Sequence, residues 1–212
     1  MSGSDNREYV WSETRSARPE YPRIERWITP RARVIDLGCG NGSLLLLLKE
    51  RKEVAGFGIE LAPSGVAACR QKGLDVRQGR IDVALTDVAD RSFDYAICNV
   101  TLQMVMYPEV TLREMRRIAR YQIISFPNFA FFINRLELLL FGRMPRWGLF
   151  GYRWYDTGHI HQLSIADFCA LARTFDLTIR QRAYLGKLGK LADLAPNFFA
   201  QTAILLLESS HV

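Results

Sequence analysis

The stretch Val34-Ile35-Asp36-Leu37-Gly38-Cys39-Gly40-Asn41-Gly42 is followed, after a leucine-rich segment, by Gly58-Ile59-Glu60. This order predicts a buried strand, a glycine turn, a helix and a second strand that ends in a carboxylate. Glycines permit the tight turn and let a ligand approach the backbone without a Cβ clash. A carboxylate at the end of the second strand suits hydrogen bonds from ribose hydroxyls. The stretch therefore predicts half of a nucleoside-binding βαβ unit.

The spacing of the glycines distinguishes between cofactors. A dinucleotide fingerprint reads G-x-G-x-x-G, whereas Gly42 comes one residue early and Asp36 stands two residues before the first glycine. The resulting pattern, D-x-G-x-G-x-G, resembles that of class I S-adenosylmethionine-dependent methyltransferases. That resemblance implies S-adenosylmethionine as the cofactor and S-adenosylhomocysteine as the product.

Composition places the chain among ordinary globular proteins. Its 212 residues, 49% hydrophobic and 24% charged, predict one domain with a full core. The four cysteines form no C-x-x-C pair, so we expect no metal site and no disulfide scaffold, and reduced thiols favour a cytoplasmic location. The net charge of +6 favours a basic solvated surface over a nucleic-acid groove, because no aromatic-interleaved basic stripe accompanies it.

Targeting and membrane signals are missing from the sequence. The first eight residues are polar and charged and lack the apolar core of a signal peptide. The longest apolar runs, 44–48 and 136–141, are too short to span a bilayer. We therefore expect no membrane association.

Strands and helices are expected to alternate along the chain. The strands fall at 33–36, 54–60, 75–78, 94–100 and 122–126, with helices at 42–51, 63–73 and 109–120. This rhythm predicts a mostly parallel sheet with helices on both faces. Strands at 177–184 and 200–207 complete a seven-stranded α/β, Rossmann-like class I methyltransferase fold with a C-terminal antiparallel strand. Ser164 and Asp167 form the signature of a capping box that opens a helix to residue 175.

The domain boundaries are predicted from the residues at which the alternation of strands and helices begins and is interrupted. Residues 1–29 predict an N-terminal tail with a short helix at 23–28 that packs on the domain. Residues 30–212 predict a single methyltransferase-like domain. An insertion at about 129–161 combines an apolar helix, 129–141, with a long shaped loop.

The three parts of S-adenosylmethionine need different partners. Backbone N–H groups of the turn, with the positive end of the next helix, suit its carboxylate. Asp36 suits the ammonium or the sulfonium, and Glu60 suits the ribose diol. The expected cofactor-binding residues are Asp36, Gly38, Cys39, Gly40, Asn41, Gly42, Glu60, Leu61, Arg80, Ile81, Asn99 and Thr101.

The adenine end departs from the class I pattern, which often places an acid after the third strand. Arg80 stands there instead, with Asp82 two residues on. A guanidinium cannot accept a hydrogen bond from the adenine amino group. Asp82 could replace the missing acid, or Arg80 could stack on the adenine ring.

Later segments resemble the methionine biosynthesis protein MetW family. The matching segments are Val100-Thr101-Leu102-Gln103, Leu112-Arg113-Glu114-Met115, Ile124-Ser125-Phe126-Pro127-Asn128-Phe129, Gly142-Arg143-Met144-Pro145, Trp154-Tyr155-Asp156-Thr157 and His159-Ile160-His161. The resemblance runs from about residue 33 to 175. It implies a methyltransferase-like fold, a link to methionine biosynthesis and support of the homoserine O-acyltransferase of that pathway.

Two functions stay open at this point. In the first, the protein methylates a small molecule, and His161, His159 and Tyr155 are the candidate catalytic residues, because histidine titrates near neutrality and can act as a base. In the second, a weakly catalytic or non-catalytic protein activates a homoserine O-acyltransferase by binding it. The helix at 129–141 could form the face for that partner or for a homodimer, and burial of this helix in the core is at least as consistent with its sequence.

Overall fold

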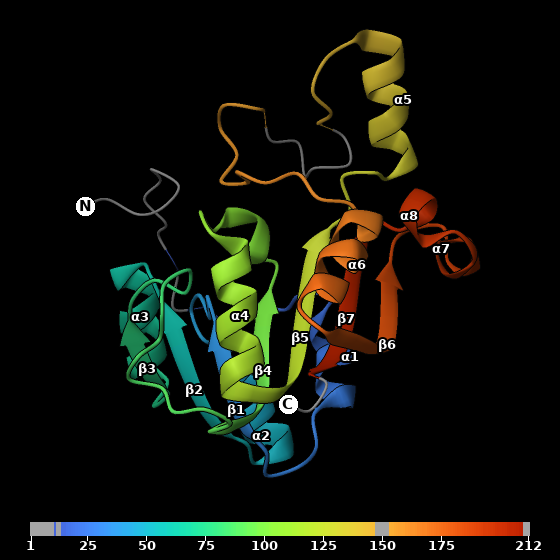
Figure 1. Cartoon of the computed structure of the whole chain (residues 1–212). Helices are drawn as coiled ribbons and strands as arrows, with labels where there is room; N and C mark the ends of the chain where they lie inside the picture. Colours follow the sequence, from blue (N-terminus) through green and yellow to red (C-terminus); the bar gives the residue numbers. More distant parts are fainter. Residues whose placement is uncertain (1–10, 12–13, 147–152, 210–212) are drawn as a thin grey trace.

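A seven-stranded sheet forms the centre of the structure, a computed structural model that describes residues 11, 14–146 and 153–209 (Figure 1). In the described part of the chain the strand order is β3-β2-β1-β4-β5-β7-β6. Strand β7 runs antiparallel to β5 and β6, and the remaining pairs are parallel. The predicted fold class is confirmed. The strands are β1 (Arg33–Leu37), β2 (Ala55–Glu60), β3 (Asp75–Gln78), β4 (Phe93–Asn99), β5 (Ala119–Pro127), β6 (Leu177–Leu185) and β7 (Thr202–Ser209).

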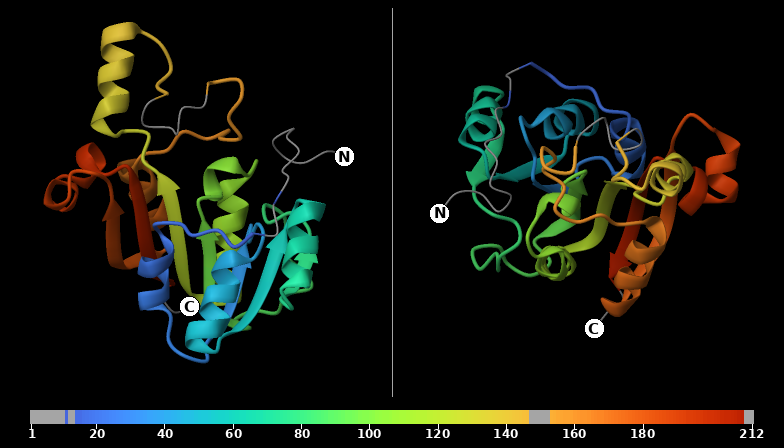
Figure 2. Two further views of the ribbon diagram at one scale, coloured as in Figure 1. Left: turned by 180° about the vertical axis from the view of Figure 1, so that it is seen from behind. Right: turned by 90° about the horizontal axis from the view of Figure 1, so that it is seen from above.

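Helices cover both faces of the sheet, as two separate cores show (Figure 2). Side chains alternate across each strand, so Val34 enters the core under α1, α2 and α3 while Ile35 enters the core under α4 and α6. The helices are α1 (Tyr21–Trp27), α2 (Ser43–Lys52), α3 (Pro63–Gln71), the 3-10 turn η1 (Leu102–Met104), α4 (Pro108–Ile118), α5 (Phe132–Phe141), α6 (Ile165–Thr174), α7 (Lys190–Leu194) and α8 (Pro196–Phe199).

Two helix starts differ from their predicted positions by more than one residue. Helix α1 begins at Tyr21 rather than residue 23, because Pro22 favours the first helical turn. Helix α5 begins at Phe132 rather than residue 129, because Asn128 Oδ1 accepts the N–H of Ala130 and holds the chain in a turn before the helix. The capping box of α6 is present as predicted, with Ser164 and Asp167 bonded reciprocally.

The buried Asn128 connects three segments that follow the parallel part of the sheet. Its Nδ2 donates to the carbonyl oxygens of Ala200 at 2.9 Å and Asn197 at 3.2 Å, and its Oδ1 accepts from Ala130 at 3.2 Å and, more weakly, from Ile165 at 3.4 Å. The side chain is only 1% exposed. Asn128 therefore fixes α8, the start of α5 and the start of α6 to the end of β5.

Replacing Asn128 with alanine is expected to lower the free energy of unfolding by roughly 3 kcal/mol, because several buried backbone groups lose their partner. Chemical denaturation of the purified variant measures the change. Asn197, which is half-buried and whose side-chain oxygen accepts one N–H, from Ala166, provides the matched control. A loss at Asn128→Ala no larger than that of Asn197→Ala would contradict the proposed role.

Candidate functional site

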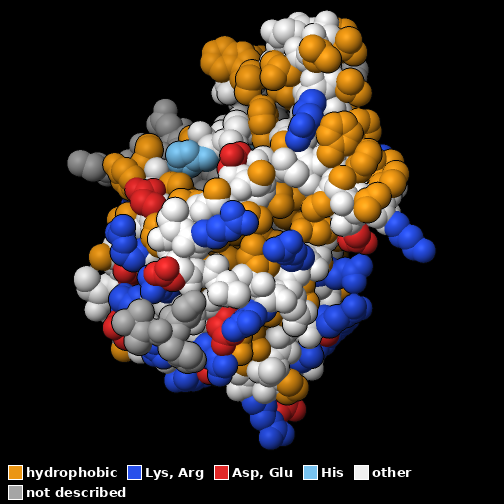
Figure 3. Space-filling model, turned by 45° about the vertical axis from the view of Figure 1, so that its right-hand side comes forward, with side chains coloured by type: hydrophobic (Ala, Val, Ile, Leu, Met, Phe, Trp, Pro, Cys, Tyr) orange, Lys and Arg blue, Asp and Glu red, His pale blue; other side chains and the backbone are white. Residues whose placement is uncertain are grey.

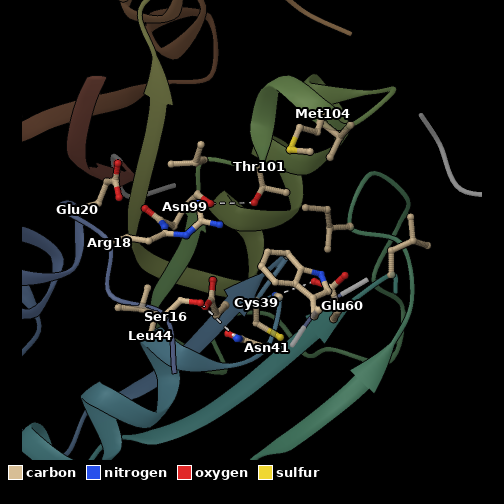
Figure 4. A pocket seen from close by; sticks show the side chains of 18 of the residues that line it. Ser16, Arg18, Glu20, Cys39, Asn41, Leu44, Glu60, Asn99, Thr101 and Met104 are labelled. Atoms are coloured by element: carbon tan, nitrogen blue, oxygen red, sulfur yellow. Dashed lines mark hydrogen bonds between the residues drawn. The ribbon is translucent and has the colours of Figure 1, made fainter. Parts of the chain in front are cut away.

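A cavity of about 550 Å³ opens at the carboxyl ends of β1, β2 and β4 (Figure 4). This volume lies within the ~300–1,000 Å³ range of small-molecule sites. The strand order reverses between β1 and β4, and open α/β sheets bind ligands at such a switch point. The cavity is lined by the turn after β1, the ends of β2 and β4, the segment after β3 and part of the N-terminal segment.

Glu60 lies at the end of β2, as predicted, and lines the cavity while only 6% exposed. Its Oε2 accepts the N–H of Gly40 at 2.7 Å and its Oε1 accepts the N–H of Ala62 at 2.9 Å. Burial raises the pKa of Glu60, and these backbone donors oppose the rise. Because a carboxylate has about four acceptor positions, Glu60 retains capacity for ligand hydroxyls.

Asp36 lines the same cavity from the end of β1 and is 2% exposed. Among the described residues, its Oδ1 is buried and has no hydrogen-bond partner. Burial, with a smaller contribution from the charge of Glu60, raises the pKa of Asp36 to about 7, and Arg18 opposes the rise. An unpaired buried acceptor is costly, so this oxygen is suited to a cationic or donor group of a ligand.

The glycines of the turn are required by the fold itself. Gly38, Gly40 and Gly42 all have positive φ angles. A Cβ on Gly38 would lie 2.5 Å from the side chain of Thr101, and one on Gly40 would lie 2.9 Å from the ring of Trp11. The space beside these glycines is therefore filled by the protein's own side chains.

Two residues that follow β3 and line the cavity form an ion pair with each other. Arg80 donates to both carboxylate oxygens of Asp82 at 2.9 Å, and the Met106 N–H donates to Asp82 Oδ2 at 2.9 Å. Burial works to raise the pKa of Asp82, but these bonds bring it below its ordinary value. With three of its acceptor positions taken, Asp82 has little capacity to replace the missing acid. Leu61 and Ile81 also line the cavity here.

The end of β4 contributes Asn99 and Thr101 to the lining. Asn99 Oδ1 accepts from Ser125 Oγ at 2.6 Å, and Thr101 Oγ1 donates to the Asn99 carbonyl at 3.0 Å. Val100 between them has a φ of 52°, which is unusual for a β-branched residue. Both polar side chains are thus held in place by internal bonds.

The structure separates the three candidate catalytic residues. His159 lines the cavity. The backbone N–H groups of Ile160 and His161 both donate to the Gln103 carbonyl at 3.0 Å, which fixes this loop beside η1. The ring of His161 lies 3.4 Å from the Met106 carbonyl, and Tyr155, 59% exposed, contacts Arg153. Neither of these two is among the described residues that line the cavity.

Sequence reasoning missed the contribution of the N-terminal segment. Trp11, Ser16, Arg18, Glu20 and Tyr21 all line the cavity. Trp11 packs against Gly40 and Gly65, and Asn41 Nδ2 donates to the Thr14 carbonyl at 2.9 Å. The sequence predicted a loose tail and packing on the domain only for the short helix at 23–28, because nothing local in the sequence indicated that residues before this helix line the cavity.

Comparison with solved structures places this arrangement in the class I methyltransferase fold. A histamine N-methyltransferase candidate from Thermotoga maritima superposes with a TM-score of 0.63, at 18% identity, over 90% of this chain and 88% of that one. An S-adenosylmethionine-dependent methyltransferase from Mesorhizobium loti gives 0.64, at 13% identity, over 89% and 97% of the two chains. A chain of the Haloferax volcanii complex between the Trm112 activator and a methyltransferase gives 0.66, at 17% identity, over 90% and 88%. These structural similarities establish the fold.

The chain belongs to the MetW family, because the family described as "Methionine biosynthesis protein MetW" matches residues 18–207. The family links the protein to methionine biosynthesis. A bifunctional methionine biosynthesis protein MetXA/MetW of Rhodopirellula baltica is 35% identical over 160 residues, or 71% of this chain. The match spans only 26% of that relative's length.

Membrane-spanning helices and clusters of metal-ligating side chains are both absent from the described residues. In residues 11, 14–146 and 153–209, no helix is both long and apolar enough to cross a membrane. The same residues contain no group of three or more histidine, cysteine, aspartate or glutamate side chains arranged to hold a metal ion.

Proposed function

We propose that the protein binds S-adenosylmethionine in this cavity and transfers its methyl group to a small molecule. The observation that carries the proposal is the convergence of Asp36 and Glu60 on one cavity at the switch point of the sheet. The buried Asp36 oxygen without a partner among the described residues fits a cationic ligand, and Glu60 fits a ribose diol. The Arg80 side chain, held flat against Asp82, offers a face on which adenine can stack.

The bound cofactor would supply an electrophilic methyl group, and the protein's part is to position it and to exclude water. Hydrophobic residues of the cavity, Leu44, Ile81, Met104 and Val105, would surround the ligand. His159 lies in the lining and could accept a proton from a methyl acceptor. His161 and Tyr155 would act indirectly, by holding the loop that carries His159.

Isothermal titration with S-adenosylmethionine tests the binding step, and detection of S-adenosylhomocysteine in the presence of candidate acceptors tests the transfer. Binding in the micromolar range is expected. No heat of binding with cofactor at about 1 mM, a concentration that detects affinities as weak as roughly −4 kcal/mol, would overturn the cofactor assignment.

A second candidate function is suggested by helix α5, which projects beyond the sheet (Figure 1). The helix buries polar residues and exposes apolar ones, the reverse of the usual arrangement. Asn134 and Glu137 are buried, and Glu137 Oε2 accepts the N–H of Arg146 at 2.8 Å. Leu139 and Leu140 are 78% and 69% exposed. Apolar side chains gather over this part of the surface (Figure 3).

We propose that this α5 face binds a homoserine O-acyltransferase, the partner implied by the family resemblance. An exposed apolar patch of this kind marks a protein–protein interface more often than a free surface. The Rhodopirellula baltica relative is named as a bifunctional MetXA/MetW protein, which supports a functional association of the MetW unit with a second activity. This role is compatible with cofactor binding, because α5 is not among the described residues that line the cavity.

The double change Leu139→Glu and Leu140→Glu is expected to weaken co-purification with the acyltransferase by at least about tenfold, since two interface contacts of ~1 kcal/mol or more are lost. The melting temperature should stay the same, because both residues are exposed. Val83→Glu, at a 41% exposed position after β3, is the matched control. Equal recovery of the acyltransferase with the α5 variant and with the control would exclude α5 as the docking face.

A further inference from the structure

Four backbone donors of the glycine turn, which was predicted to bind the cofactor's carboxylate, already have acceptors within the protein. The N–H groups of Gly38 and Cys39 both donate to the Ile59 carbonyl, at 2.8 and 3.2 Å. The Gly40 N–H donates to Glu60 Oε2, and the Gly42 N–H donates to the Cys39 carbonyl at 3.0 Å. A ligand carboxylate would have to break these bonds to use these four donors, which favours a side chain as its main partner.

Arg18 is placed to be that partner. Its side chain extends from the N-terminal segment into the cavity (Figure 4). The other arginine of the described lining, Arg80, is engaged by both oxygens of Asp82. By contrast, Arg18 forms no ion pair within 4.0 Å among the described residues: its guanidinium lies 6.0 Å from the centre of the Trp11 ring, and its charge acts on Glu20 and Asp36 from a longer distance. A guanidinium presents a planar fork of donors that matches a carboxylate in a bidentate manner.

The segment that carries Arg18 is fixed to the turn and to α2. The Ser16 N–H donates to Ser43 Oγ at 2.9 Å, and Asn41 Nδ2 donates to the Thr14 carbonyl at 2.9 Å. On the far side of Arg18, the Tyr21 N–H donates to the Arg18 carbonyl at 3.1 Å. The backbone of Arg18 is therefore held on both sides, which positions its side chain at low entropic cost.

We propose that Arg18 binds the carboxylate of the amino-acid part of S-adenosylmethionine. The inference rests on the proposed cofactor function. It places the carboxylate-binding part of the site, which was expected at the glycine turn, on the N-terminal segment. Arg18 and Asp36 then recognise the two opposite charges of one zwitterion, and Glu60 lies at the ribose beyond them. Recognition of the amino-acid part thus depends on residues from both sides of the cavity.

The decisive experiment compares two ligands that differ only in the carboxylate, S-adenosylmethionine and decarboxylated S-adenosylmethionine, by isothermal titration. Arg18→Met is expected to weaken S-adenosylmethionine binding by about 10- to 100-fold, the effect of one charge-assisted pair. The dissociation constant of the decarboxylated ligand should change less than about twofold, because this ligand has no carboxylate for Arg18 to bind. Arg18→Lys should give an intermediate loss with S-adenosylmethionine.

Arg15→Met is the matched control, because Arg15 lies in the same segment but pairs with Glu50 at 2.8 Å outside the cavity lining. It should leave both affinities unchanged. Equal losses for the two ligands with Arg18→Met, or no loss for either, would overturn the assignment of Arg18 while the cofactor function stands. Failure of the unaltered protein to bind S-adenosylmethionine would overturn both.

Discussion

Replacing Glu60 with alanine is expected to weaken S-adenosylmethionine binding by about 100-fold or more, the largest effect of any single change in the cavity. Two charge-assisted hydrogen bonds to the ribose, at ~1.5–3 kcal/mol each, would be lost. The buried N–H groups of Gly40 and Ala62 would also lose their acceptor. The same variant should therefore be less stable by about 2 kcal/mol or more.

Isothermal titration and chemical denaturation separate these two effects of the Glu60 change. Glu60→Gln preserves the shape and one acceptor oxygen, so it should retain more stability than Glu60→Ala while still binding the cofactor weakly. Glu53→Ala, at an exposed carboxylate beyond α2 that pairs with Arg31, controls for the loss of one negative charge. An unchanged affinity in Glu60→Ala would remove this residue from the site.

Changing Asp36 to asparagine is expected to alter how stability depends on pH. In the folded protein, burial raises the pKa of Asp36 to about 7, against an ordinary value of 3.8. The folded state therefore binds a proton that the unfolded state releases between these two pH values. Protonation of Asp36 therefore stabilises the folded protein. This contribution to the free energy of unfolding is fully present below about pH 4 and is lost as the pH rises through 7.

Denaturation of both proteins between pH 4 and pH 8 measures this effect. The free energy of unfolding of Asp36→Asn should increase relative to that of the unaltered protein by about 4 kcal/mol across the range. Subtracting one curve from the other cancels the contributions of the carboxylates that do not interact with Asp36. A difference that stays constant with pH would show that Asp36 titrates with an ordinary pKa in the folded protein.

The same residue should make cofactor binding depend on pH. A cationic ligand favours the ionised form of Asp36, so binding below pH 7 must displace a proton. Affinity for S-adenosylmethionine should fall by up to about tenfold per pH unit below 7, and the heat of binding should vary with the ionisation enthalpy of the buffer. Asp36→Asn should bind more weakly at pH 8 and lose most of this dependence.

The strands and the acidic ends of β1 and β2 were predictable because their signals are local. A buried apolar run followed by glycine needs only neighbouring residues to define it, and the strand–turn–helix–strand order then places Asp36 and Glu60 together. The capping box of α6 was predictable for the same reason, since Ser164 and Asp167 lie within one helical turn.

Other parts of the site depend on contacts between segments far apart in the sequence. Trp11 and Arg18 enter the cavity because Ser43 and Asn41 hold the segment between them, a relation with no local signature. His159 and His161 are two residues apart, a spacing that would place them on one face if the chain were extended. The bonds to the Gln103 carbonyl instead leave only His159 among the described lining residues. The apolar sequence of α5 is compatible with either a buried or an exposed apolar face. In the structure Asn134 and Glu137 occupy the buried face of the helix, so its leucines are exposed.

The attachment of residues 14–20 to the turn and to α2 has a consequence for the stability of that segment. If Arg18 binds the ligand, linkage requires the ligand to stabilise the attached segment by the same free energy that the segment adds to binding. Residues 14–20 would then exchange their amide hydrogens more slowly as the concentration of S-adenosylmethionine rises. The concentration of the methyl donor would in this way set the local stability of the segment that carries Arg18.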